Sequence, residues 1–206
     1  MPASVRNNDY RIFAAIIALL AWATLILQYF LKTGSSINFF SFFTIQSNIL
    51  VALVTSSAIL TPHSAPAKLL SGTSIRTAVA LYIMVVSLVY NTVLRGLVPL
   101  AGLGLLADTM LHVIIPILYL IYWILATRFK TLSYHKGLAW LIFPFAYLIY
   151  SLIRGAMVGW YPYPFLNAGQ LGYEKVMLNV VGMILVFPFA GLLLIAGLRN
   201  RYKRQH

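Results

Sequence analysis

Long apolar stretches alternate with short polar or Pro/Gly-rich segments along this chain. A membrane-spanning helix needs about 20 predominantly apolar residues, and six stretches reach that length. They are approximately Tyr10–Leu31, Phe39–Leu60, Arg76–Val98, Ala107–Thr127, Gly137–Val158 and Tyr173–Leu198. No connecting segment is long enough to hold a soluble domain. The pattern therefore predicts an all-α, polytopic membrane protein, with residues 1–206 forming a single domain of six transmembrane helices.

The first apolar stretch has some features of a secretory signal peptide. Arg6 and Arg11 precede it, and Ala21-Trp22-Ala23 within it has the small-residue spacing of a cleavage site. The stretch nevertheless stays apolar through Leu31, with no polar region at the candidate cleavage site. We therefore expect it to be an uncleaved first helix.

Composition supports a location in the membrane. Of the 206 residues, 61% are hydrophobic and only 9% are charged, whereas about a quarter of the residues of a soluble domain are charged. The chain has no cysteine, which excludes a disulfide framework, a thiolate nucleophile and cysteine-ligated metal centres. The net charge of +12 comes from basic residues scattered between apolar stretches, so we expect contacts with anionic lipids and not with nucleic acid.

The distribution of the basic residues predicts the orientation of the helices. If both termini are cytoplasmic, only Lys32, Arg95, Arg154 and Lys175 lie on the outer side. The other eleven lie inside: Arg6, Arg11, Lys68, Arg76, Arg128, Lys130, Lys136, Arg199, Arg201, Lys203 and Arg204. Because cytoplasmic segments are enriched in Lys and Arg, we predict that both termini are cytoplasmic.

Polar side chains within the apolar stretches gather at one depth. At a rise of about 1.5 Å per residue, five lie roughly 8–12 Å from the outer end of their own helix: Thr44, Asn91, His112, Ser151 and Asn179. Arg95, Asp108 and Arg154 lie one turn closer to the outer surface. The inner halves carry no ionisable Asp, Glu, His, Lys or Arg before their cytoplasmic ends. A transporter or proton channel needs a route through the midplane, so this one-sided layer instead favours an amphiphile that reacts near the outer interface.

The layer contains a candidate general base. His112 is the only intramembrane histidine, and Asp108 lies one turn earlier on the same helix face, where it can orient the imidazole. One His and one Asp are too few for a zinc site, so we expect no metal or other cofactor. The alternative role of His112 is a structural hydrogen bond between helices.

The nucleophile and the oxyanion donor are less well defined by the residues alone. Thr44, Ser47 and Ser151 all offer a hydroxyl in the layer, and spacing does not choose among them. Backbone donors in the middle of a helix are already committed to the helix, so a side-chain amide must stabilise an oxyanion. Gln46, Asn48 and Asn91 are the candidates.

Three segments resemble a known family. They are Phe42-Phe43-Thr44-Ile45-Gln46-Ser47-Asn48, Asp108-Thr109-Met110-Leu111-His112-Val113-Ile114-Ile115-Pro116 and Tyr161-Pro162-Tyr163-Pro164-Phe165. They resemble the bacterial Pr6Pr family, which is similar to the FAR-17a/androgen-induced membrane proteins. In the androgen-induced relatives, a threonine and a histidine hydrolyse fatty acid esters of hydroxy fatty acids. The resemblance implies that Thr44 and His112 are this pair, and that the membrane is a bacterial plasma membrane.

We therefore expect a hydrolase of lipid esters with Thr44 as nucleophile, His112 as base and Asp108 as the orienting acid. Asn179 and Ser151 belong to the expected substrate site, and Arg95 or Arg154 either anchors lipid phosphates or binds the free carboxylate of the substrate. The alternative is a lipid- or small-molecule-binding or transport protein without catalysis, in which Thr44 and His112 only tie two helices together.

Overall fold

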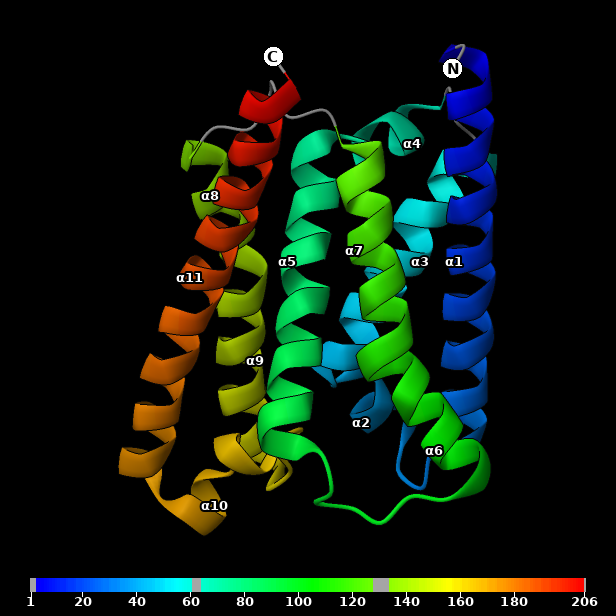
Figure 1. Ribbon diagram of the computed structural model, residues 1–206. Coiled ribbons are helices and arrows are strands. Elements are labelled where there is room, and N and C mark those ends of the chain that lie inside the picture. The colour runs from blue at the N-terminus through cyan, green and yellow to red at the C-terminus, as the bar shows by residue number, and fades with distance from the viewer. Residues whose placement is uncertain (1–2, 61–63, 128–133, 206) are drawn as a thin grey trace.

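A computed structural model describes residues 3–60, 64–127 and 134–205, and within these ranges all regular structure is helical (Figure 1). The first half contains α1 (Ala3–Leu31), α2 (Ser36–Phe40), α3 (Phe43–Leu60), α4 (Ala65–Leu70), α5 (Thr73–Val89) and the π-helical turn η1 (Tyr90–Leu94). The second half contains α6 (Gly102–Thr109), the π-helical turn η2 (Met110–Ile114), α7 (Ile115–Ala126), α8 (Tyr134–Trp140), α9 (Ile142–Val158), the 3₁₀ turn η4 (Pro164–Leu166), α10 (Ala168–Leu171) and α11 (Tyr173–Gln205).

Five helical segments are long and apolar enough to cross a membrane, which indicates a multi-pass membrane protein. They are Tyr10–Leu31, Thr73–Leu94, Gly102–Ala126, Gly137–Val158 and Tyr173–Gly197. The apolar part of α3, Phe43–Ile59, is shorter. The prediction of helical membrane segments is thus confirmed for five of the six stretches.

The stretch expected as one helix over Phe39–Leu60 is divided between α2 and α3. Side chains take the place of helical hydrogen bonds at this break. The Gln46 amide donates to the Phe40 carbonyl at 2.9 Å, and the Tyr147 hydroxyl donates to the Ser41 carbonyl at 2.9 Å. The Ser41 hydroxyl also bonds with the hydroxyl of Tyr150 at 2.7 Å. Because α9 supplies both tyrosines, tertiary contacts hold the break open.

The two helix ends on either side of the loop at Arg95 differ from the sequence prediction. The helical stretch expected to reach Val98 ends at Leu94, and Arg95 is extended. Gly96 follows with φ +85°, a conformation that glycine adopts without a steric penalty. The helix expected to begin at Ala107 begins earlier, at Gly102.

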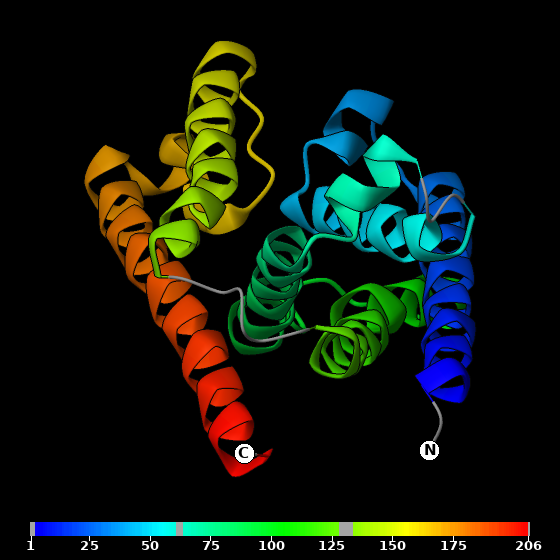
Figure 2. The same cartoon turned by 90° about the horizontal axis from the view of Figure 1, so that it is seen from above.

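The helices form a bundle in which α5 is central. α1, α3, α5 and α7 pack against one another, and α11 packs on another side of α5 (Figure 2). Large buried side chains fill the region between them, including Ile17, Leu81, Leu111 and Tyr119. The start of α1 and the end of α11 lie at the same end of the bundle (Figure 1). The basic residues Arg128 and Lys130 lie outside the described residues.

Candidate functional site

The structure brings the expected acid and base together at the junction of α6 and η2. His112 Nδ1 lies 3.1 Å from Asp108 Oδ1 and 2.9 Å from the main-chain carbonyl oxygen of Asp108. Both neighbours accept hydrogen bonds, so the neutral ring carries its proton on Nδ1. Nε2 then keeps its lone pair, which is the arrangement that a general base requires.

Tyr90 completes this cluster, although the sequence pattern did not predict its part in the site. Its ring stacks on the His112 ring with centroids 3.7 Å apart and an interplanar angle of 12°. Its hydroxyl donates to Asp108 Oδ2 at 2.5 Å. Asp108 and His112 are four residues apart on one helix, whereas Tyr90 comes from η1 on another. Helical spacing finds the first pair but gives no signal for the third member.

Two of the expected oxyanion donors bond to helix carbonyls in the structure. Pro116 lacks an N–H, so the carbonyls of Leu111 and His112, five and four residues earlier, have no helical donor from that position. The Asn48 amide donates to the Leu111 carbonyl at 3.3 Å, and the Asn91 amide donates to the His112 carbonyl at 3.4 Å. Each amide also donates to its own helix, Asn48 to Thr44 O at 2.9 Å and Asn91 to Ser87 O at 2.8 Å. In this structure the Asn48 and Asn91 amides therefore bond to helix carbonyls, and their role as oxyanion donors stays a prediction.

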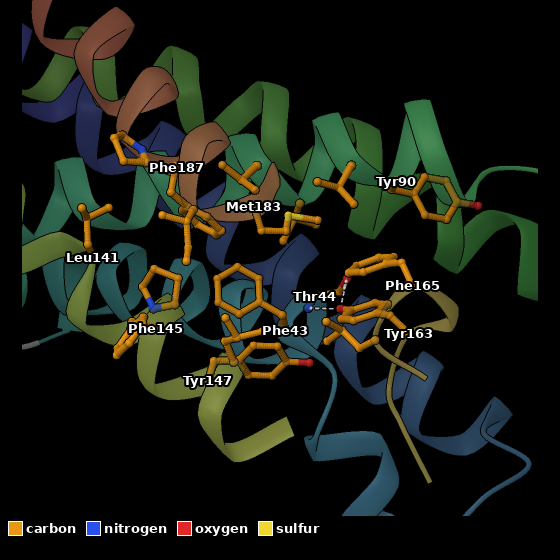
Figure 3. A pocket seen from close by; sticks show the side chains of 18 of the residues that line it. Phe43, Thr44, Tyr90, Leu141, Phe145, Tyr147, Tyr163, Phe165, Met183 and Phe187 are labelled. Carbon is orange, nitrogen blue, oxygen red and sulfur yellow. Dashed lines mark hydrogen bonds between the residues drawn. The ribbon is translucent and has the colours of Figure 1, made fainter. Parts of the chain in front are cut away.

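Thr44 lines an apolar cavity of about 360 Å³ (Figure 3). α3, α5, η1, α8, α9, α11 and the segment before α10 contribute its walls, which are mainly aliphatic and aromatic. Hydroxyl-bearing side chains among the lining residues are those of Thr44, Tyr90, Tyr147 and Tyr163. The cavity has the size and lining of a site for an acyl chain.

The Thr44 hydroxyl has Tyr163 as its partner. Thr44 Oγ1 lies 3.3 Å from the Tyr163 hydroxyl oxygen, and the Thr44 N–H donates to the same oxygen at 3.2 Å. Figure 3 shows both bonds at one side of the cavity. Burial raises the pKa of the Tyr163 hydroxyl above its usual value, against the lowering effect of its hydrogen bonds to Thr44. The phenol therefore stays protonated and can donate.

Thr44 and His112 flank the same helix contact without a hydrogen bond between them in the described residues. α3 meets η2 through the bond from Asn48 to Leu111 O. Thr44 lies one turn before Asn48, and His112 directly follows Leu111. Tyr90 lines the cavity and its ring stacks on His112, whereas His112 itself is not among the lining residues.

The other residues predicted for the site lie at several places around Thr44 and His112. Ser47 and Ser151 are buried, with hydroxyls that have no partner within the described part of the chain. Asn179 donates to Phe165 O at 2.8 Å and so fixes the segment before α10. Gln46 bonds to the Phe40 carbonyl at the α2–α3 break.

Arg95 and Arg154 differ in their surroundings. Arg95 is exposed and donates to Asn91 Oδ1 at 3.0 Å. Arg154 donates from Nη2 to Asn38 Oδ1 at 2.6 Å, lies over the Trp160 ring at 4.7 Å, and has a buried Nη1 with no partner among the residues described. Recognition of a substrate carboxylate by either arginine stays a prediction.

Within the described ranges, no three His, Asp or Glu side chains gather as a metal site requires. Comparison of the chain with models of protein families, with curated proteins and with solved structures gives no match. The function must therefore be argued from the site.

Proposed function

We propose that this protein is an intramembrane hydrolase of lipid esters, such as fatty acid esters of hydroxy fatty acids. The observation that carries the proposal is the position of Thr44 on the wall of an apolar cavity of about 360 Å³, on a helix, α3, that contacts η2, the turn that holds His112. An acyl chain in the cavity would bring its ester carbonyl to Thr44. The resemblance to the Pr6Pr family supports the same pair.

In the proposed reaction, Thr44 Oγ1 attacks the ester carbonyl carbon and His112 Nε2 takes the hydroxyl proton. The tetrahedral intermediate then expels the alcohol, which receives that proton from His112, and leaves an ester on Thr44. Water, deprotonated by His112, hydrolyses this ester and restores the hydroxyl. Asp108 holds the imidazole through Nδ1, as the distance of 3.1 Å allows.

Formation of this pair requires a local rearrangement. Thr44 Oγ1 now faces Tyr163, and the Tyr90 ring stacks on His112. Catalytic hydrogen bonds often tighten only when substrate is bound. We propose that the bound ester displaces the Tyr90 ring and brings Nε2 within reach of Oγ1.

The experiment is hydrolysis of a fluorogenic long-chain ester by the purified protein in lipid nanodiscs. Thr44→Ala and His112→Ala should each abolish turnover, and the double variant should be scarcely worse than either, because nucleophile and base act as a unit. Thr55→Ala is the matched control, since Thr55 is a buried threonine on the same helix that bonds only to backbone carbonyls. Mass spectrometry should locate a fluorophosphonate adduct on Thr44.

Full turnover by Thr44→Ala would reject this mechanism. An adduct on Ser47 or Ser151 would transfer the role of nucleophile to that residue.

The bond between Thr44 and Tyr163 favours a second function, binding of a lipid or small molecule without catalysis. In that case Thr44 would only close the cavity wall. Binding of a fatty acid without measurable hydrolysis, together with no adduct on Thr44, would identify this function.

We further propose that α3 is a sixth span, that both termini are cytoplasmic, and that the membrane is a bacterial plasma membrane. The run of α3 alongside α1 supports the sixth span. The eleven-to-four division of basic residues supports the orientation.

A further inference from the structure

The break between α2 and α3 leaves a backbone donor beside the proposed nucleophile. α3 begins at Phe43, and the first N–H groups of a helix have no helical acceptor. The Thr44 N–H donates to the Tyr163 hydroxyl instead, and the Gln46 side chain occupies the Phe40 carbonyl one turn before Thr44. Thr44 therefore has an N–H that makes no helical hydrogen bond and lies next to its own hydroxyl, which a threonine in the middle of a helix would lack.

Aromatic packing fixes the Tyr163 ring. It lies parallel to the Phe165 ring at an interplanar angle of 3° and a centroid distance of 5.2 Å. The Phe42 ring contacts it edge-on at 5.7 Å. A donor held in this way is oriented before substrate arrives, which is the condition for stabilising charge in a transition state.

We propose that the Tyr163 hydroxyl and the Thr44 N–H together form the oxyanion site of the lipid-ester hydrolase. The inference rests on the proposed function. The Thr44 nitrogen and the Tyr163 oxygen lie 3.2 Å apart, so one oxygen can lie within hydrogen-bond distance of both. The same oxygen would be next to Thr44 Oγ1, which lies 3.3 Å from the Tyr163 hydroxyl.

The Thr44 N–H and the Tyr163 hydroxyl change hydrogen-bond partners as the ester binds and reacts. In the free protein the Tyr163 oxygen accepts the bond from the Thr44 N–H. When Oγ1 bonds to the ester carbon, the carbonyl π electrons move to its oxygen, and the Thr44 proton moves to His112. The Thr44 N–H then donates to the new oxyanion in place of the Tyr163 oxygen. The Tyr163 O–H donates to the same oxyanion. Collapse of the intermediate returns the electrons and expels the alcohol, which leaves with the proton from His112.

The test compares two variants that each lose one tyrosine hydroxyl. Tyr163→Phe keeps the ring stack on Phe165, and we expect kcat for the long-chain ester to fall about 10²–10³-fold with little change in KM. Tyr119→Phe is the control, because Tyr119 is also buried and bonded through its hydroxyl, to the Arg76 carbonyl at 3.3 Å, but does not line the cavity. It should keep near-normal kcat.

An alkyl trifluoromethyl ketone separates an oxyanion donor from a structural residue. It forms a tetrahedral adduct with the nucleophile, whereas the matching methyl ketone fills the cavity without forming one. Tyr163→Phe should weaken inhibition by the trifluoromethyl ketone by the same factor as kcat/KM and leave binding of the methyl ketone unchanged.

The possible outcomes distinguish failure of the oxyanion role from failure of the proposed hydrolase. Two results would overturn the oxyanion role: a normal kcat in Tyr163→Phe, or a lost kcat with unchanged inhibition by the trifluoromethyl ketone. In either case, an inactive Thr44→Ala variant would still support the hydrolase. Equal weakening of both ketones would assign Tyr163 to cavity shape. Absence of any adduct on Thr44 in the unmodified protein would overturn the hydrolase and the oxyanion site together.

Discussion

Two acceptors on one residue hold the Nδ1 proton of His112. The Asp108 carboxylate lies at 3.1 Å and the Asp108 carbonyl at 2.9 Å. In a Ser-His-Asp triad, replacing the acid by its amide lowers kcat about 10⁴-fold through the wrong tautomer. Here the main-chain acceptor remains after such a change, so the Nδ1 proton stays in place.

We therefore expect Asp108→Asn to lower kcat much less than the 10⁴-fold loss of a triad, by about 10–100-fold. His112→Ala in the same ester assay is the reference for complete loss of the base. If Asp108→Asn is as inactive as His112→Ala, the carboxylate itself holds the tautomer and the main-chain bond does not suffice.

The residues of the site differ in whether their contacts could be predicted from the sequence. Asp108 and His112 were predictable, because the helix repeat places residues four apart on one face. Tyr90 and Tyr163 were not, because they reach Asp108 and Thr44 from segments 18 and 119 residues away in the chain. A single sequence contains no signal for contacts that arise only from the packing of separate helices.

At the level of the helix, Pro116 and Asn48 form a unit across two elements. Pro116 provides no N–H for the Leu111 carbonyl, and the buried Asn48 amide takes that place at 3.3 Å. A buried carbonyl without a donor costs about 1–3 kcal/mol. The two residues should therefore be energetically coupled.

When Pro116 is present, Asn48→Leu should clearly lower the unfolding temperature of the detergent-solubilised protein. The loss should be smaller in a Pro116→Ala background, where residue 116 can donate to the helix again. A coupling of about 1–2 kcal/mol from the double-mutant cycle is the expected result. Thr55→Val on the same helix should combine additively with Pro116→Ala, and strict additivity for Asn48→Leu as well would show that the amide does not replace the missing donor.

Helix positions were largely predictable, whereas helix interruptions were not. Apolar runs identify the long helices because lipid contact demands them. The break before α3 depends on hydroxyls supplied by Tyr147 and Tyr150. The break between α8 and α9 likewise depends on Tyr82, whose hydroxyl donates to Trp140 O at 2.7 Å, the carbonyl four residues before Pro144. The proline signals a freed carbonyl, but only the fold shows which donor reaches it.

Across the whole molecule, basic residues at one end of the bundle also satisfy helix ends. Arg11 donates to Ile59 O at 3.3 Å near the end of α3, and Arg76 donates to Ala126 O at 3.1 Å at the end of α7. Cations at helix C-termini offset the partial negative charge there. The same residues thus cap helices and contribute to the excess of positive charge that predicts the cytoplasmic side.

The orientation can be tested by cysteine labelling, since the chain has no natural cysteine. Thr33 and Gln170 are exposed near α2 and within α10, and Ala65 is exposed at the start of α4 at the opposite end (Figure 1). With cytoplasmic termini and α3 as a sixth span, an impermeant maleimide should label Thr33→Cys and Gln170→Cys in intact cells. Ala65→Cys should react only after permeabilisation. Labelling of the Thr33 and Ala65 variants from the same side would show that α3 does not cross the membrane, because α3 connects them, and a complete inversion would place Thr44 nearer the cytoplasmic face.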